Sequence, residues 1–101
     1  MRAFDLLGKR WTGVLLGTLS DGPSGFRALA RTVEGVSDSM LSERLRELTN
    51  AGLVDRTVTE GPPVSVTYEL TEAGRALLPA LEQISRWAEV HLPPDAQAKT
   101  G

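Results

Sequence analysis

The 101-residue chain contains no cysteine. This excludes disulfides, thiolate metal sites, cysteine nucleophiles and thiol-based redox sensing for these 101 residues. It has a single histidine, His91, so one chain cannot build a histidine metal centre, and we expect neither a metal nor a cofactor. No apolar run approaches the roughly 20 residues that span a bilayer, and the first residues do not form a signal peptide. We therefore expect a cytoplasmic protein without membrane contact.

A basic excess is also lacking, since the formal net charge is -2. Nonspecific nucleic-acid binders are usually strongly basic, so this balance argues against that class. Specific DNA binding is not excluded, because the positions of the cations matter more than their sum. The hydrophobic fraction of 41% and the charged fraction of 24% are ordinary for a globular protein. We predict one domain over residues 1–92 and a flexible tail over residues 93–101.

No catalytic constellation is recognisable. Serines are plentiful, but no histidine accompanies them in the pattern of a hydrolase triad. The glycines at 8, 13 and 17 lie inside or beside a predicted helix, which is the wrong context for a phosphate-binding loop. We therefore predict that the protein is not an enzyme, and we interpret His91 as a surface or dimer-edge residue.

The first half of the chain shows helical periodicity. Ser24 and Ser37 are the expected N-caps of the last two helices of this half. Gly52 is the expected left-handed residue that ends the last one. Apolar side chains at helical spacing predict four helices, over residues 4–7, 10–19, 25–32 and 38–50.

After Gly52 the pattern changes to the alternation of a β-hairpin, with strands over residues 53–59 and 64–70. A long helix follows up to Pro93, and Pro79 should kink it or mark the end of its first turn. Two short helices joined by a tight turn and followed at once by a hairpin form a winged helix-turn-helix. The predicted fold class is mainly α (α+β), with a two-stranded hairpin wing and a long C-terminal dimerisation helix.

The helix over residues 38–50 carries the functional prediction. Leu41, Leu45 and Leu48 share one face, which must pack inward. The opposite face shows hydroxyls and long hydrogen-bonding groups of the kinds that reach base edges or phosphates. The alternative is a solvated, salt-bridged face, as on most exposed helices. The residues of this helix that we assign to a DNA recognition surface in the major groove are Ser37, Ser39, Met40, Ser42, Glu43, Arg44 and Arg46.

Other candidate DNA contacts are fewer. Arg27 and Arg31 lie four residues apart and share a helix face, and Lys9 starts the preceding helix. These cations suit phosphates, although lone surface cations more often only add solubility. On the hairpin, Ser65 and Thr67 offer neutral hydrogen bonds, but the tip carries no cation. A hairpin that merely packs on the domain is therefore a serious alternative.

The last helix has more apolar positions than one monomer stripe needs, which indicates a partner surface. The simplest partner is a second copy, because twofold dimers read pseudo-palindromic operators. The alternative is that Trp87 caps its own core. A further hypothesis is a small-molecule effector pocket at the dimer interface, lined by Trp11, Leu15 and Trp87. The expected interface residues are Phe4, Leu7, Trp11, Leu77, Leu81, Ile84, Trp87 and Ala88.

Several segments resemble the HxlR-type regulators of the MarR-like winged-helix group, and the likeness extends from about residue 7 to residue 91. The resemblance implies a homodimer held by the first and last helices, a recognition helix over about residues 38–50 and a hairpin wing. It also implies repression or activation of nearby genes. The strings that carry it are Gly-Lys-Arg-Trp-Thr at 8–12, Ser-Asp-Ser-Met-Leu-Ser-Glu-Arg-Leu-Arg-Glu-Leu at 37–48 and Leu-Thr-Glu-Ala-Gly at 70–74.

By position, Ser37, Ser42, Arg44 and Arg46 match hydroxyls and arginines of the family's recognition helix. Basic residues common in the family are replaced at three places, by Gly25, by Ser39 and by the pair at 64–65. Members that sense oxidants use a cysteine before the first helix, and this chain has none. The predicted function is a sequence-specific, dimeric DNA-binding transcription regulator. The alternative is a winged-helix protein-interaction module without DNA binding.

Overall fold

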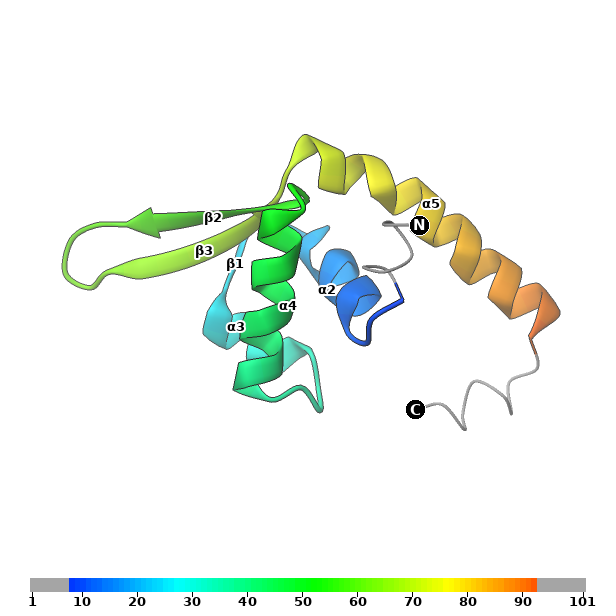
Figure 1. Ribbon diagram of the computed structural model, residues 1–101, viewed down its shortest axis with the longest axis horizontal. Helices are drawn as coiled ribbons and strands as arrows, with labels where there is room; N and C mark the ends of the chain where they lie inside the picture. The colour runs from blue at the N-terminus through cyan, green and yellow to red at the C-terminus, as the bar shows by residue number, and fades with distance from the viewer. Residues whose placement is uncertain (1–7, 93–101) are drawn as a thin grey trace.

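The computed structural model describes residues 8–92. In Figure 1, the short helices lie at the centre, the hairpin projects to one side and the last helix extends to the other. The predicted helix over residues 4–7 and the predicted tail lie outside the described residues. Within that range the elements are α2 (Thr12–Leu19), β1 (Ser24–Gly25), α3 (Phe26–Thr32), α4 (Asp38–Asn50), β2 (Val54–Thr59), β3 (Ser65–Leu70) and α5 (Glu72–His91).

The described residues form one antiparallel sheet with the strand order β1-β3-β2. The hairpin is confirmed, with a register running from Val54 opposite Leu70 to Thr59 opposite Ser65. The prediction of only two strands was incomplete, because β1 adds a third strand in which Ser24 pairs with Tyr68. Ser24 is therefore a strand residue, and the N-cap of α3 is the next residue, without a side-chain bond.

The two predicted signals at the ends of α4 are confirmed. The Ser37 hydroxyl oxygen accepts a hydrogen bond from the Met40 amide at 3.1 Å. Gly52 has a φ of +81°, the left-handed conformation that glycine adopts without steric cost. The Leu53 amide then donates to the Leu48 carbonyl at 3.0 Å, which is the Schellman pattern of helix termination. The ends of α4 are thus fixed by local bonds.

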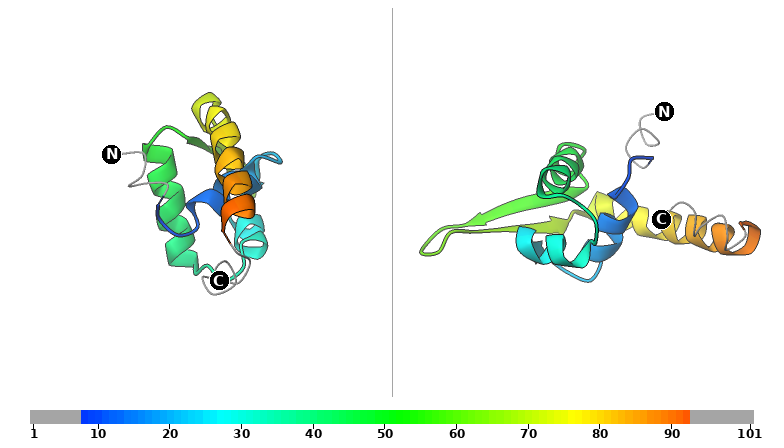
Figure 2. Two further views of the ribbon diagram at one scale, coloured as in Figure 1. Left: turned by 90° about the vertical axis from the view of Figure 1, so that its right-hand side faces the viewer. Right: turned by 90° about the horizontal axis from the view of Figure 1, so that it is seen from below.

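Leucine side chains dominate the core, which lies between the helices and the base of the sheet. The first half of α5 covers this core with Leu77, Leu78 and Leu81. Its second half extends away from the domain (Figures 1 and 2). Pro79 lies inside α5 and not at its first turn, and no described helix is apolar enough to span a membrane. The core residues are Leu15, Leu16, Leu19, Leu29, Val33, Leu41, Leu45, Leu48, Val54 and Leu70.

The junction between α4 and α5 is tight at Gly74. The Thr71 hydroxyl caps α5 by accepting from the Gly74 amide at 3.0 Å and donates to the Gly52 carbonyl at 2.6 Å. A Cβ atom at position 74 would overlap the Leu53 carbonyl oxygen and lie 3.2 Å from Leu70 Cδ2. The Leu53 oxygen cannot move freely, because it accepts from the Thr71 amide.

We predict that Gly74→Ala lowers the free energy of unfolding by about 1–3 kcal/mol, because the added methyl overpacks this junction. The matched control is Gly17→Ala in α2, where a Cβ atom would meet nothing within 4 Å. That change should stabilise the protein by about 0.5–1 kcal/mol through helix propensity. Urea denaturation followed by circular dichroism measures both. Equal free energies of unfolding for the two variants would show that the junction accommodates the added methyl group.

Candidate nucleic-acid interface

Helices α3 and α4 form the helix-turn-helix, and two contacts fix their relative position. Gly35 turns the chain between them with a φ of +87°, and a Cβ atom there would lie 3.3 Å from Trp11 Cη2. Arg27 of α3 forms an ion pair with Asp38 in the first turn of α4, with a nitrogen–oxygen distance of 2.7 Å. The turn is thus held against the start of α2 and at the N-terminus of α4.

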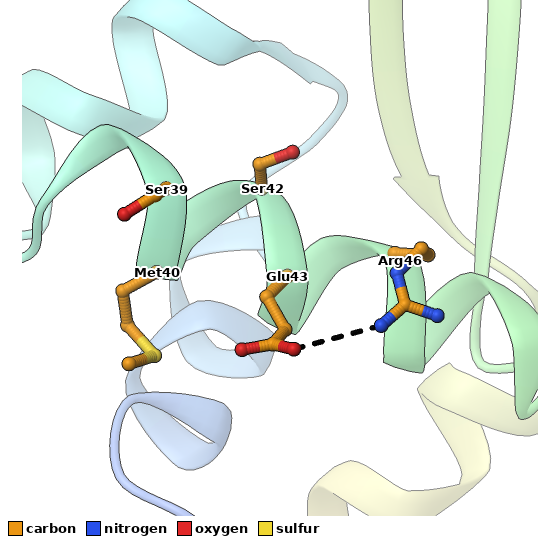
Figure 3. A pocket seen from close by; sticks show the side chains of 5 residues that line it. All are labelled: Ser39, Met40, Ser42, Glu43 and Arg46. Atoms are coloured by element: carbon orange, nitrogen blue, oxygen red, sulfur yellow. Dashed lines mark ion pairs between the residues drawn. The ribbon is translucent and has the colours of Figure 1, made fainter.

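Helix α4 buries one face and presents the other, as predicted. Leu41, Leu45 and Leu48 are at most 1% exposed. The opposite face surrounds a shallow, open hollow of about 420 Å³. Figure 3 shows Glu43 and Arg46 pointing toward one another across this face, with 3.6 Å between the charged atoms. The side chains that line the hollow are Ser39, Met40, Ser42, Glu43 and Arg46.

A charge network joins α4 to the segment that enters α2. The carboxylate of Glu47 holds one cation on each oxygen, Lys9 at 2.6 Å and Arg44 at 2.8 Å. Arg44 also donates from Nε to the Arg10 carbonyl at 3.1 Å. The pKa of Glu47 is lowered, chiefly by the hydrogen bond from Lys9. Burial raises this pKa, but the hydrogen bond and the positive charge of Arg44 lower it further. The network ties α4 to the rest of the domain by charge-assisted hydrogen bonds.

This network changes the expected roles of two residues. Arg44 was assigned to DNA by its match to the family, but its side chain is only 13% exposed and is bonded to Glu47 and to the Arg10 carbonyl. Lys9 was assigned to a phosphate, yet its ammonium group is bonded to Glu47. The expectation that Arg44 contacts DNA does not fit this position, and we leave it out of the proposed contact set.

The remaining predicted contacts on the first helices differ in availability. Arg31 is exposed and forms no ion pair with any residue in the range 8–92. Arg27 is exposed as well, although Asp38 holds its guanidinium. The Ser37 hydroxyl oxygen serves as a helix cap. Arg31 is therefore the α3 cation most available to a phosphate.

On the wing, Ser65 is exposed near the tip, whereas Thr67 is half-buried in the central strand between Gly25 and Thr57. Sequence reasoning missed Arg56, which lies on β2 opposite Tyr68 and is exposed. The expected place for a cation was the tip of the hairpin. A usable signal was present, because Arg56 is the one basic residue between positions 53 and 70.

The far half of α5 exposes apolar side chains. Ile84 is 55% exposed, Trp87 56% and Val90 76%. The Trp87 ring packs on His91 with 5.5 Å between ring centroids, so the alternative that Trp87 caps the core does not fit. Of the other expected interface residues, Leu77 and Leu81 pack on the core, Ala88 is half-buried, and Phe4 and Leu7 lie outside the described residues.

The hypothesis of an effector pocket receives no support from Leu15, which is fully buried in the core. Trp11 is half-buried and packs against the same core. An effector site between two copies of the chain therefore stays a prediction. Across residues 8–92, no group of three or more acidic, histidine or cysteine side chains could hold a metal ion.

We predict that Glu47→Gln lowers the melting temperature at neutral pH, because the neutral amide loses both ion pairs, with Lys9 and with Arg44. Glu43→Gln, at an exposed pair, should change it much less. Folding lowers the pKa of Glu47, so its carboxylate stabilises the folded protein at pH values above the pKa of the unfolded state. That stabilisation is lost as the pH falls through the pKa of the folded state. The gap between wild type and Glu47→Gln should therefore narrow in acid. A gap that stays constant with pH would contradict this role for the carboxylate.

The sequence of the chain is similar to those of HTH-type transcriptional regulators. The chain is 44% identical over 87 residues to the HTH-type transcriptional regulator YodB of Bacillus subtilis, covering 86% of this chain and 78% of YodB. It is 39% identical over 93 residues to the uncharacterised HTH-type regulator YvaP of the same organism, covering 92% and 86% of the two chains.

Solved structures of similar regulators superpose closely on this chain. The reduced form of YodB superposes with a TM-score of 0.86 at 42% identity, covering 92% of this chain and 91% of YodB. The redox regulator HypR in its reduced form gives 0.81 at 36% identity, covering 87% of each chain. The family described as HxlR-like helix-turn-helix matches residues 6–96. This protein therefore belongs to the HxlR-like family of winged helix-turn-helix proteins and is a transcriptional regulator, not an enzyme.

Proposed function

We propose that this regulator acts as a homodimer that binds double-stranded DNA at a pseudo-palindromic operator, with α4 in the major groove. The observation that supports this most is the division of α4 into two faces. One face is buried by leucines, and the other presents Ser39, Ser42 and Arg46 to solvent. A protruding helix of this kind fits the width of the major groove, and its polar groups match base edges and phosphates.

The proposed phosphate contacts are few. Arg31 and Arg56 are exposed without an ion pair inside residues 8–92, and Arg27 adds a partly engaged cation. The wing is a weak contributor, since Arg56 is outnumbered there by Asp55, Glu60 and Glu69. We therefore infer that affinity depends on α3 and α4 more than on the wing, and that its dependence on salt is modest.

The proposed dimer interface is the far half of α5. Ile84, Trp87 and Val90 form an exposed apolar surface that a monomer would leave in water. Pairing two copies along this helix would bury the surface and would place two α4 helices on one duplex. The twofold symmetry of such a dimer is the reason for expecting a pseudo-palindromic site.

A small-molecule effector stays a hypothesis for this chain. One structure of YodB is described as quinone-bound. The sequence of this chain contains no cysteine, so an effector would have to be held without a thiol from these 101 residues. The competing function is a winged-helix module that binds a protein and no DNA, which the acidic wing favours.

We expect the purified protein to enrich one pseudo-palindromic site from genomic fragments, with affinity that falls as salt rises. Arg31→Ala should weaken binding to all duplexes alike and reduce the salt slope by about one unit per copy of the chain. The control is Arg86→Ala, because Arg86 lies on α5 and pairs with Glu82 at 2.7 Å. Fluorescence anisotropy over a salt series measures both. Failure to bind any fragment at low salt would favour the protein-interaction module.

We predict that Ile84→Glu converts the dimer into a monomer, because a carboxylate would be buried in the apolar interface. Ile84 is 55% exposed in the single chain, so the fold itself should tolerate the change. Ser85→Glu is the matched control, since Ser85 is exposed and the change alters the net charge equally, away from the face formed by Ile84, Trp87 and Val90. Analytical ultracentrifugation separates the two species. A monomeric wild type, or a dimeric Ile84→Glu variant, would exclude this interface.

A further inference from the structure

Three carboxylates lie on α4, and they differ in how firmly they are held. Asp38 pairs with Arg27 at 2.7 Å, and Glu47, which is partly buried, holds two cations. Glu43 instead pairs with Arg46 at 3.6 Å, with side chains 51% and 63% exposed. A long, exposed ion pair contributes little stability and is easily rearranged. Glu43 and Arg46 are therefore free to make new contacts, whereas Glu47 serves the fold. The Asp38–Arg27 pair is shorter than the Glu43–Arg46 pair but just as exposed.

The Glu43–Arg46 pair lies where a hydrogen-bonding partner can reach both side chains. Both side chains lie on the outward face of α4, beside the short side chains of Ser39 and Ser42 (Figure 3). Together with Met40 they line the shallow hollow. The short serines leave the charged ends of Glu43 and Arg46 as the groups that project furthest. A partner that enters this hollow would meet a hydrogen-bond donor, the Arg46 guanidinium, beside an acceptor, the Glu43 carboxylate.

This combination has a chemical complement in DNA. A guanidinium only donates hydrogen bonds, and a carboxylate only accepts them. In the major groove, guanine offers two acceptors, O6 and N7, and its partner cytosine offers the N4 amino donor. A carboxylate facing thymine O4 or a purine N7 would instead meet another acceptor. Adenine N6 can also donate to a carboxylate, but adenine offers a guanidinium only the N7 acceptor, whereas guanine offers two. The Glu43–Arg46 pair is thus complementary to the edge of a G·C base pair.

The spacing along the helix is compatible with this match. Residues three apart are separated by about 4.5 Å along an α-helix axis. Stacked base pairs are separated by about 3.4 Å. Two side chains in this relation reach the same base pair or two neighbouring ones.

We propose that Glu43 and Arg46 act together as a reader of G·C pairs, Arg46 donating to guanine O6 and N7 and Glu43 accepting from cytosine N4. The two bases belong to the same or adjacent pairs in each half-site. This inference rests on the proposed DNA binding and adds which bases the recognition helix selects. It also assigns Glu43, which repels phosphates, a role in rejecting sequences that present acceptors at its position.

The test is selection from a random duplex library by wild type, Glu43→Gln and Arg46→Gln. Wild type should enrich a G·C pair whose replacement weakens binding by about 5- to 150-fold. Glu43→Gln should bind the same site but lose most of the discrimination at the cytosine. Replacing the guanine by 7-deazaguanine removes the N7 acceptor, so it should weaken wild type and leave Arg46→Gln almost unchanged.

Glu82→Gln is the matched control, because Glu82 and Arg86 form another exposed Glu–Arg pair, on α5. It should keep the wild-type base preference, and thermal melts should show all variants folded. If Glu43→Gln and Arg46→Gln bind with unchanged preferences, the inference is wrong although DNA binding stands. If wild type binds no duplex, the proposed function fails and the inference fails with it.

Discussion

The burial of Leu41, Leu45 and Leu48 determines what α4 can present to a partner. These side chains are at most 1% exposed, and they anchor the helix against the core of the domain. Because side chains repeat every 3.6 residues around a helix, burying this face leaves the opposite one in solvent. Ser42 and Arg46 are exposed for that reason. The surface that carries the proposed function is thus a consequence of how the hydrophobic core is built.

Electrostatics adds a second level of organisation. Arg44 and Arg46 are two residues apart, and the helix directs them to different sides. Arg44 bonds to Glu47 and to the Arg10 carbonyl at a partly buried position and so positions the helix. Arg46 stays in solvent beside Glu43. Lys9 and Arg44 are therefore used to hold elements together. The cations left for a partner are those without an ion pair inside residues 8–92, such as Arg31 and Arg56, because the position of a charge matters more than the net charge of -2.

Helix α5 serves two purposes along its length. Leu77 and Leu81 pack on the core, while Ile84, Trp87 and Val90 remain exposed. The Thr71 cap and the close contact at Gly74 fix where this helix leaves the domain. A partner held on its far half would therefore take a defined position relative to α4. This arrangement gives a physical basis for linking the proposed dimer to the proposed DNA recognition.

The sequence by itself determined the helix faces, the hairpin and the Ser37 and Gly52 signals, because periodicity and capping depend on residues within a turn or two of each other. Only the tertiary structure decided that Ser24 pairs with Tyr68 and that Arg44 turns inward toward Arg10. It also showed Arg56 to be an available cation. The physical reason is that these features depend on segments distant in the chain, whose approach is set by packing of the whole core and leaves no local pattern.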